Sequence, residues 1–78
     1  MEYRYLTIRT EYTDGGTVRT GYGIAAVTGH GMAETVIQSF ADLCPDNTPV
    51  EQLVWYCNKL QLDIIHLPEV AEDFLTGL

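Results

Sequence analysis

A glycine pair at residues 15–16 separates two stretches of alternating side chains, and this arrangement most constrains the fold. Residues 2–12 are rich in Tyr, Thr and Ile, which favour strands. Asp14, Gly15 and Gly16 tolerate the positive φ angles that a tight hairpin turn requires. Residues 17–28 alternate again, so residues 2–28 are predicted to form a β-hairpin.

Alternation assigns the side chains of each strand to two faces. The first strand carries one set at Leu6, Ile8 and Tyr12 and a second set at Tyr3, Tyr5 and Arg9. We expect the first set to face the core, which leaves Tyr3 and Tyr5 outside it. The returning strand carries Val18, Tyr22, Ile24 and Ala26 on one face. Gly21 and Gly23 leave its other face flat and open to close approach of another backbone.

The stretch 32–44 fits two structures. Its apolar residues recur at helical spacing, at Ala33, Val36, Ile37, Phe40 and Cys44. The same stretch also reads as a strand with Val36 and Phe40 on one face. Because the preceding Gly29-His30-Gly31 segment is a tight turn signal, we predict a third strand.

Two helices are predicted in the second half. Thr48 is a candidate N-cap with Pro49 in the first turn, and Glu51 completes a Thr-x-x-Glu capping box. Helix 48–62 then carries one apolar stripe, at Val50, Leu53, Val54, Cys57 and Leu60. Pro68 opens a last helix that runs to about Thr76, with inward positions at Leu67, Ala71, Phe74 and Leu78 and with Gly77 suited to its C′ position.

These elements predict a single α+β domain over residues 1–78. We expect a small N-terminal antiparallel sheet of two or three strands with two helices packed on one face. A core this small leaves roughly 3–5 kcal/mol of stability, so a homodimer or a bound partner is expected.

Several short stretches also resemble a known family. They are Tyr22-Gly23-Ile24, Leu53-Val54, Cys57-Asn58 followed by Leu60, and the C-terminal run from His66 to Leu75, which reads His-Leu-x-x-Val-x-x-Asp-Phe-Leu. Together they are similar to a family of short bacterial proteins of unknown function, mainly from anaerobic Gram-positive species. The resemblance covers residues 3–76 and implies a strand-rich first half followed by helices. It implies no activity.

The net charge of −7 is concentrated in one half of the chain. Residues 1–22 are neutral, whereas residues 23–78 carry eight acidic side chains against Lys59 alone. Such a chain should repel nucleic acid and anionic lipid and should suit a basic protein partner. The N-terminal residues lack a signal peptide's apolar stretch, so a cytoplasmic location is expected, with Cys44 and Cys57 reduced.

The residues that could carry chemistry are few and poorly spaced. His30, Cys44, Cys57 and His66 are separated by gaps of 14, 13 and 9 positions, whereas zinc sites usually pair two ligands within one turn. Cys57 with His66 could form a nucleophile and base, but Cys57 lies on the apolar stripe, where burial blunts a thiol. We therefore predict no metal, no cofactor and no catalytic residue.

The predicted partner-binding residues lie on the two helices. Trp55 falls opposite the apolar stripe, with Glu51 and Leu62 as neighbours, and tryptophan is enriched at binding hot spots. Either Trp55 is exposed and binds a partner, or it is covered by the link 63–67 or by the sheet. The last helix carries Glu69, Glu72 and Asp73. Either Glu72 or Asp73 pairs with one of the hairpin arginines, Arg4, Arg9 or Arg19, or this acidic face awaits a basic partner.

The predicted function is a non-enzymatic acidic protein–protein interaction module. In its most specific form it is an inhibitor that occupies a basic nucleic-acid-binding surface of its partner, as phage-borne anti-defence (anti-CRISPR-like) proteins do. One alternative is a bacterial housekeeping regulator or subunit whose acidic face only keeps it in solution. A small metal- or thiol-dependent enzyme is the rival from another class.

Overall fold

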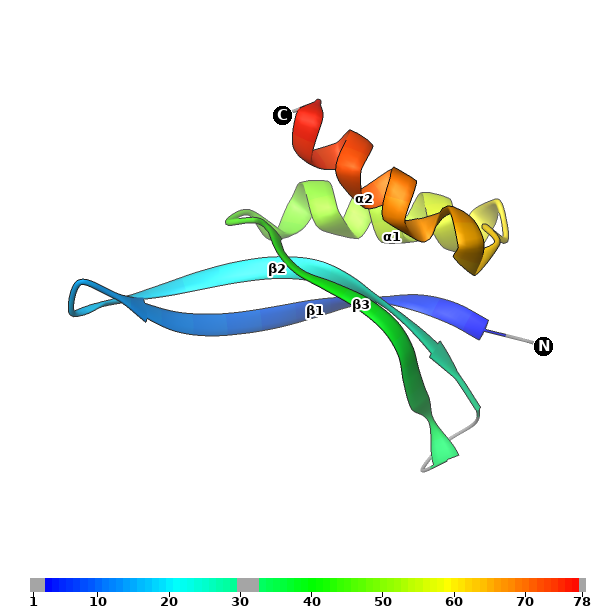
Figure 1. Cartoon of the computed structure of the whole chain (residues 1–78), viewed down its shortest axis with the longest axis horizontal. Coiled ribbons are helices and arrows are strands. Elements are labelled where there is room, and N and C mark those ends of the chain that lie inside the picture. Colours follow the sequence, from blue (N-terminus) through cyan, green and yellow to red (C-terminus); the bar gives the residue numbers. More distant parts are fainter. Residues whose placement is uncertain (1–2, 30–32, 78) are drawn as a thin grey trace.

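The computed structural model describes residues 3–29 and 33–77. Its elements follow the order β1 (Tyr3–Asp14), β2 (Thr17–Thr28), β3 (Thr35–Cys44), α1 (Asn47–Lys59), the short 3-10 helix η2 (Ile64–His66) and α2 (Leu67–Thr76). The strands precede the helices along the chain, and both helices pack over one side of the sheet (Figure 1). The predicted α+β class, with a three-stranded antiparallel sheet and two C-terminal helices, is confirmed.

The sheet has the order β1-β2-β3, and both pairings are antiparallel. Asp14 faces Thr17 across a two-residue turn, in which Gly15 and Gly16 have φ angles of 58° and 84°. Two consecutive positive φ angles characterise the type I′ turn, whose twist matches that of the flanking strands. The turn signal in the sequence therefore predicted this hairpin correctly.

The third strand is confirmed, and glycine explains how it approaches β2. A Cβ atom on Gly23 would collide with the backbone carbonyl oxygen of Phe40, so only glycine fits there. The register shifts between Tyr22 and Ile24, where Asp42 of β3 adopts a φ of 59°. Of the preceding turn signal, His30 and Gly31 lie outside the described residues.

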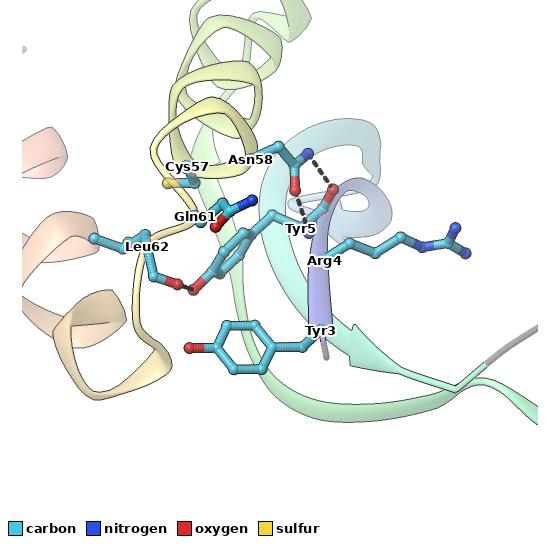
Figure 2. A pocket seen from close by; sticks show the side chains of 7 residues that line it. All are labelled: Tyr3, Arg4, Tyr5, Cys57, Asn58, Gln61 and Leu62. Atoms are coloured by element: carbon cyan, nitrogen blue, oxygen red, sulfur yellow. Dashed lines mark hydrogen bonds between the residues drawn. The ribbon is translucent and has the colours of Figure 1, made fainter. Parts of the chain in front are cut away.

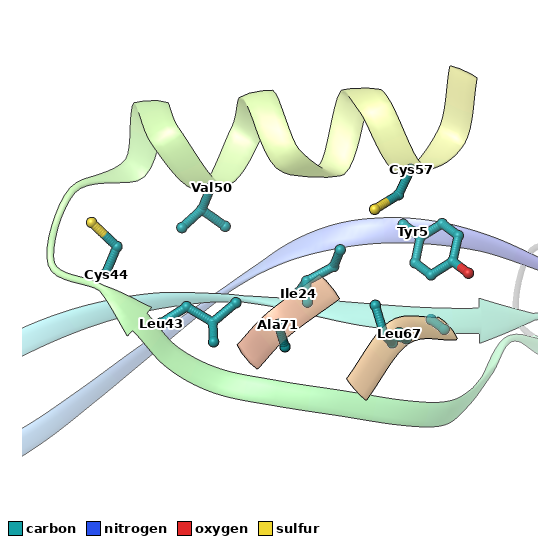
Figure 3. Packing of buried hydrophobic residues seen from close by; sticks show 9 residues of the cluster. Tyr5, Ile24, Leu43, Cys44, Val50, Cys57, Leu67 and Ala71 are labelled. Atoms are coloured by element: carbon teal, nitrogen blue, oxygen red, sulfur yellow. The ribbon is translucent and has the colours of Figure 1, made fainter. Parts of the chain in front are cut away.

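The core lies between the sheet and the helices (Figure 3). Its buried members come from every strand and both long helices: Tyr5, Ile24, Ala26, Leu43, Cys44, Val50, Cys57, Leu67 and Ala71. Both cysteines are buried and free. Phe74 packs against this cluster as predicted, whereas Leu78 lies outside the described residues.

The prediction for the two faces of β1 was wrong. Tyr5 is only 2% exposed and Tyr3 packs against the core, whereas Leu6 and Tyr12 are exposed. The tyrosines can be buried because each phenol finds a partner. The Tyr5 hydroxyl donates to the Leu62 carbonyl at 2.6 Å, and the Tyr3 hydroxyl accepts from the Ile64 N–H at 2.8 Å.

The start of α1 also differs from the prediction. Asp46, not Thr48, is the N-cap, and no side chain caps the helix, so the Thr48–Glu51 capping box does not form. Pro49 consequently sits at the third helical position. Glu51 instead accepts a hydrogen bond from Asn47 at 2.9 Å.

The helix ends at Lys59, three residues earlier than predicted. Gln61 adopts a left-handed φ of 50°, its N–H donates to the Asn58 carbonyl, and the Leu62 N–H donates to the Cys57 carbonyl at 3.0 Å. This is the Schellman arrangement, here built on a residue other than glycine. It turns Leu62 back against the core and leaves Leu60, predicted as part of the apolar stripe, 71% exposed.

The last helix follows the prediction closely. Leu67 and Ala71 are buried, and Pro68 stands in its first turn. Gly77 is the C-cap, with a right-handed φ of −83° instead of the left-handed conformation expected at C′. Within residues 3–29 and 33–77, no helix has the length and apolar content needed to cross a membrane.

Candidate interaction surface

An exposed aromatic pair lies on α1. Trp55 is 54% exposed, and the Tyr56 ring meets it edge-on with centroids 5.2 Å apart. The Lys59 ammonium group sits 4.6 Å from the centre of the Trp55 ring, within the range of a cation–π contact. Trp55 is therefore held in place by its own helix while its ring remains open to solvent.

The acidic side chains of α2 are exposed as well. Glu69, Glu72 and Asp73 form no salt bridge with any residue of the described chain. The arginines that could have neutralised them pair within the sheet region instead, as Arg4–Glu34, Arg9–Glu11 and Arg19–Asp14. The structural explanation for the acidic helix, pairing with the hairpin arginines, is therefore wrong.

The predicted site residues divide into three groups. Glu51 lies one helical turn before Trp55 and is exposed. Leu62 is half-buried against the core and does not belong to the exposed surface around Trp55. The three acids form a separate group on α2. The candidate interaction surface thus consists of two patches on neighbouring helices, an aromatic one on α1 and an acidic one on α2.

A cleft of about 460 Å³ opens where β1 meets the end of α1 (Figure 2). Its lining residues are Tyr3, Arg4, Tyr5, Cys57, Asn58, Gln61 and Leu62. The Asn58 side chain is committed to the backbone of Tyr5: its Oδ1 accepts from the Tyr5 N–H at 2.8 Å and its Nδ2 donates to the Tyr5 carbonyl at 2.9 Å. Sequence reasoning missed this pairing, because an asparagine on a helix surface carries no signal of it.

Two ionisable groups that line this cleft, Tyr5 and Cys57, have raised pKa values. Burial, with smaller contributions from Tyr3, Cys57 and Asp63, raises the pKa of Tyr5 to about 12. Burial also raises the pKa of the Cys57 thiol. Raising either pKa reduces the fraction of the anion, which is the reactive form of a thiol.

No group of three or more His, Cys, Asp and Glu side chains that could hold a metal occurs among the described residues. Of the four candidate ligands, Cys44 and Cys57 belong to the core, and His66 ends η2 at the surface. His30 lies outside the described residues. The dispensability of metal stays a prediction.

These features define a small α+β protein whose helical layer exposes aromatic and acidic side chains. The chain belongs to a family of unknown function (DUF6514), whose model matches residues 1–77. No match was found among curated proteins or among solved structures. The resemblance noted in the sequence is confirmed at the level of an unknown-function family that covers nearly the whole chain.

Proposed function

We propose that this protein is a non-enzymatic interaction module that presents the helical layer to a basic partner protein. The exposure of Trp55 carries the proposal. A tryptophan that is more than half exposed, with its ring oriented by Lys59 and Tyr56, has the character of a binding anchor.

Charge supports the choice of partner. The acids of α2 form no salt bridge within the described chain, and residues 23–78 carry the whole net charge of −7. Complementary charge speeds encounter with a basic surface and disfavours acidic ones. The most specific form of the proposal is an inhibitor that covers a basic nucleic-acid-binding surface, and it rests on charge alone.

The thiol chemistry of the rival enzyme has less support. Cys57 is buried in the core with a raised pKa, and Cys44 is buried at the end of β3. Reactive cysteines are usually at least partly exposed, whereas both of these thiols are buried. A non-enzymatic role therefore remains the better supported proposal.

Affinity capture from the source cells tests this function. Parent protein, Trp55→Ala and the double variant Glu69→Lys with Glu72→Lys would serve as baits, with Asp46→Lys as a charge-reversal control outside both patches. We expect a basic protein to be enriched by the parent and the control and lost with both test variants. A partner retained by both test variants would contradict the proposal. Displacement of nucleic acid from the captured protein would identify the inhibitor form.

A further inference from the structure

The two hydrogen bonds of the Asn58 side chain show which backbone N–H and C=O groups of β1 point away from β2. Both the N–H and the C=O of Tyr5 bond to this side chain, so neither is directed at β2. β1 is an edge strand in the order β1-β2-β3. In effect, the Asn58 amide takes the place of a neighbouring strand at this one position.

In an antiparallel strand, successive residues direct their backbone N–H and C=O groups alternately towards one neighbour and towards the other side. Residues with the same parity as Tyr5 also direct their N–H and C=O groups outward. Between Tyr5 and the turn, these residues are Thr7, Arg9, Glu11 and Thr13. Across residues 3–29 and 33–77, no backbone or side-chain hydrogen bond outside the sheet itself satisfies these outward groups.

The part of the hairpin that bears this edge also lacks cover from the helices. Figure 1 shows the β1–β2 turn extending well beyond α1 and α2. From Arg9 to Arg19 every side chain is exposed, including Tyr12 and Val18. A bare two-stranded ribbon is only marginally stable in water, and a long unpaired edge invites another strand.

We propose that two copies of this chain pair antiparallel through their β1 edges, with Thr10 of one copy opposite Thr10 of the other. The free edge is bounded by Asn58 at Tyr5 and by the turn at Gly15. Its outward residues run from Thr7 to Thr13 and are centred on Thr10. A twofold axis at Thr10 is therefore the arrangement in which all of them find partners, and it joins two three-stranded sheets into one.

Charge selects the same register independently. With the axis at Thr10, Arg9 of each copy lies opposite Glu11 of the other. In the two neighbouring registers that still pair outward N–H and C=O groups with each other, the twofold axis passes through residue 9 or residue 11. They place Arg9 opposite Arg9, or Glu11 opposite Glu11, and like charges directly opposite are destabilising. Arg9 and Glu11 are exposed in the single chain, where they bond to each other at 2.7 Å.

The other side-chain pairs in this register are also favourable. On the face away from the helices, Ile8 lies opposite Tyr12 of the second copy, which is an aliphatic–aromatic pair. On the opposite face, which is the side of the sheet that bears the helices, Thr7 lies opposite Thr13. Because Tyr12 is 40% exposed in the single chain, such pairing would cover apolar surface that is open to solvent there.

Charge variants analysed by sedimentation velocity test the register. Parent protein should dimerise at high micromolar concentration. Arg9→Glu and Glu11→Arg should each raise the dissociation constant of the dimer at least about tenfold. Each variant places like charges opposite each other, and the twofold symmetry makes this contact occur twice in the dimer. The double variant Arg9→Glu with Glu11→Arg should dimerise like the parent. An equimolar mixture of the two single variants should associate, since one copy then supplies two acids and the other two bases.

Cysteine crosslinking tests the position of the axis. Thr10→Cys would face itself in a non-hydrogen-bonded pair, where Cα atoms lie about 4.5 Å apart, within disulfide range. Thr13→Cys is the control, because its two copies would lie about 20 Å apart along the strand. Mild oxidation should link the first variant and not the second. A monomeric parent, a dimer insensitive to both single charge variants, or equal crosslinking of the two cysteine variants would overturn the proposal.

Discussion

Asn58 of α1 occupies the edge of the sheet by bonding both backbone groups of Tyr5, at 2.8 and 2.9 Å. This contact joins residues 53 positions apart in the sequence and ties the end of α1 to β1. It orients Tyr5, whose ring enters the core (Figure 3), and it ends the free edge of β1.

Asn58→Ala should therefore destabilise the fold. Losing two hydrogen bonds and leaving the Tyr5 groups without their partner should lower the free energy of unfolding by about 1–3 kcal/mol. Urea denaturation measures the change. Asn47→Ala is the matched control on the same helix, because it removes one exposed side-chain bond to Glu51 and should cost well under ~1 kcal/mol. Equal losses for the two variants would contradict this role of Asn58.

Tyr5 should make stability sensitive to alkaline pH. Its pKa is raised from 10.0 to about 12 in the folded protein, mainly by burial. A raised folded pKa stabilises the neutral form, so this contribution is fully present below pH 10 and is lost as the pH rises towards 12. Thermal melting between these values should show a decline.

Tyr5→Phe should flatten that alkaline decline. At neutral pH it should also lower the free energy of unfolding by about 1 kcal/mol, because the Leu62 carbonyl loses its hydrogen bond. Tyr12→Phe, at an exposed position, should retain the decline seen in the parent. A decline of the same size in Tyr5→Phe would show that another group is responsible.

The acids of α2 should matter for binding more than for folding. Glu69→Lys with Glu72→Lys should change the free energy of unfolding by less than ~1 kcal/mol, because these side chains are exposed. Binding to the partner should weaken markedly, most of all at low salt, where complementary charge contributes most. Affinity measured across a salt series checks this. Unfolding of the double variant, or parent-like binding, would remove α2 from the proposed surface.

Direct binding to nucleic acid is not expected. Residues 23–78 carry the net charge of −7, and the hairpin arginines are paired with acidic side chains. Binding to duplex DNA at physiological salt should therefore be weaker than micromolar in a fluorescence anisotropy titration. Micromolar affinity would contradict the charge argument.

Metal removal should leave the melting temperature unchanged. The buried thiols of Cys44 and Cys57 belong to the apolar core, and His66 lies at the surface. A calorimetric scan with and without a strong chelator provides the measurement. A large decrease that zinc reverses would contradict this prediction and would make His30, Cys44, Cys57 and His66 candidate ligands again.

The sequence alone determined the order of the long elements and the type of each, except that residues 32–44 fitted both a helix and the strand that was predicted. Gly15 and Gly16 permit the type I′ turn, alternation on either side of it predicts the two strands, and Gly23 allows β3 to approach. Pro68 and the apolar spacing after it predict α2. These features are local, because backbone sterics and side-chain period act over a few residues.

Tertiary structure decided which side of each element is buried. β1 carries apolar side chains on both faces, so alternation separates Leu6 from Tyr5 but does not say which one meets the helices. Tyr5 is buried because Asn58 and the Leu62 carbonyl, both more than 50 residues away in sequence, satisfy its backbone and its hydroxyl. Likewise Gln61, a residue with no special preference for left-handed backbone, ends α1 early because the turn it makes brings Leu62 into the core. Burial of these groups depends on distant partners, which only the folded chain brings together.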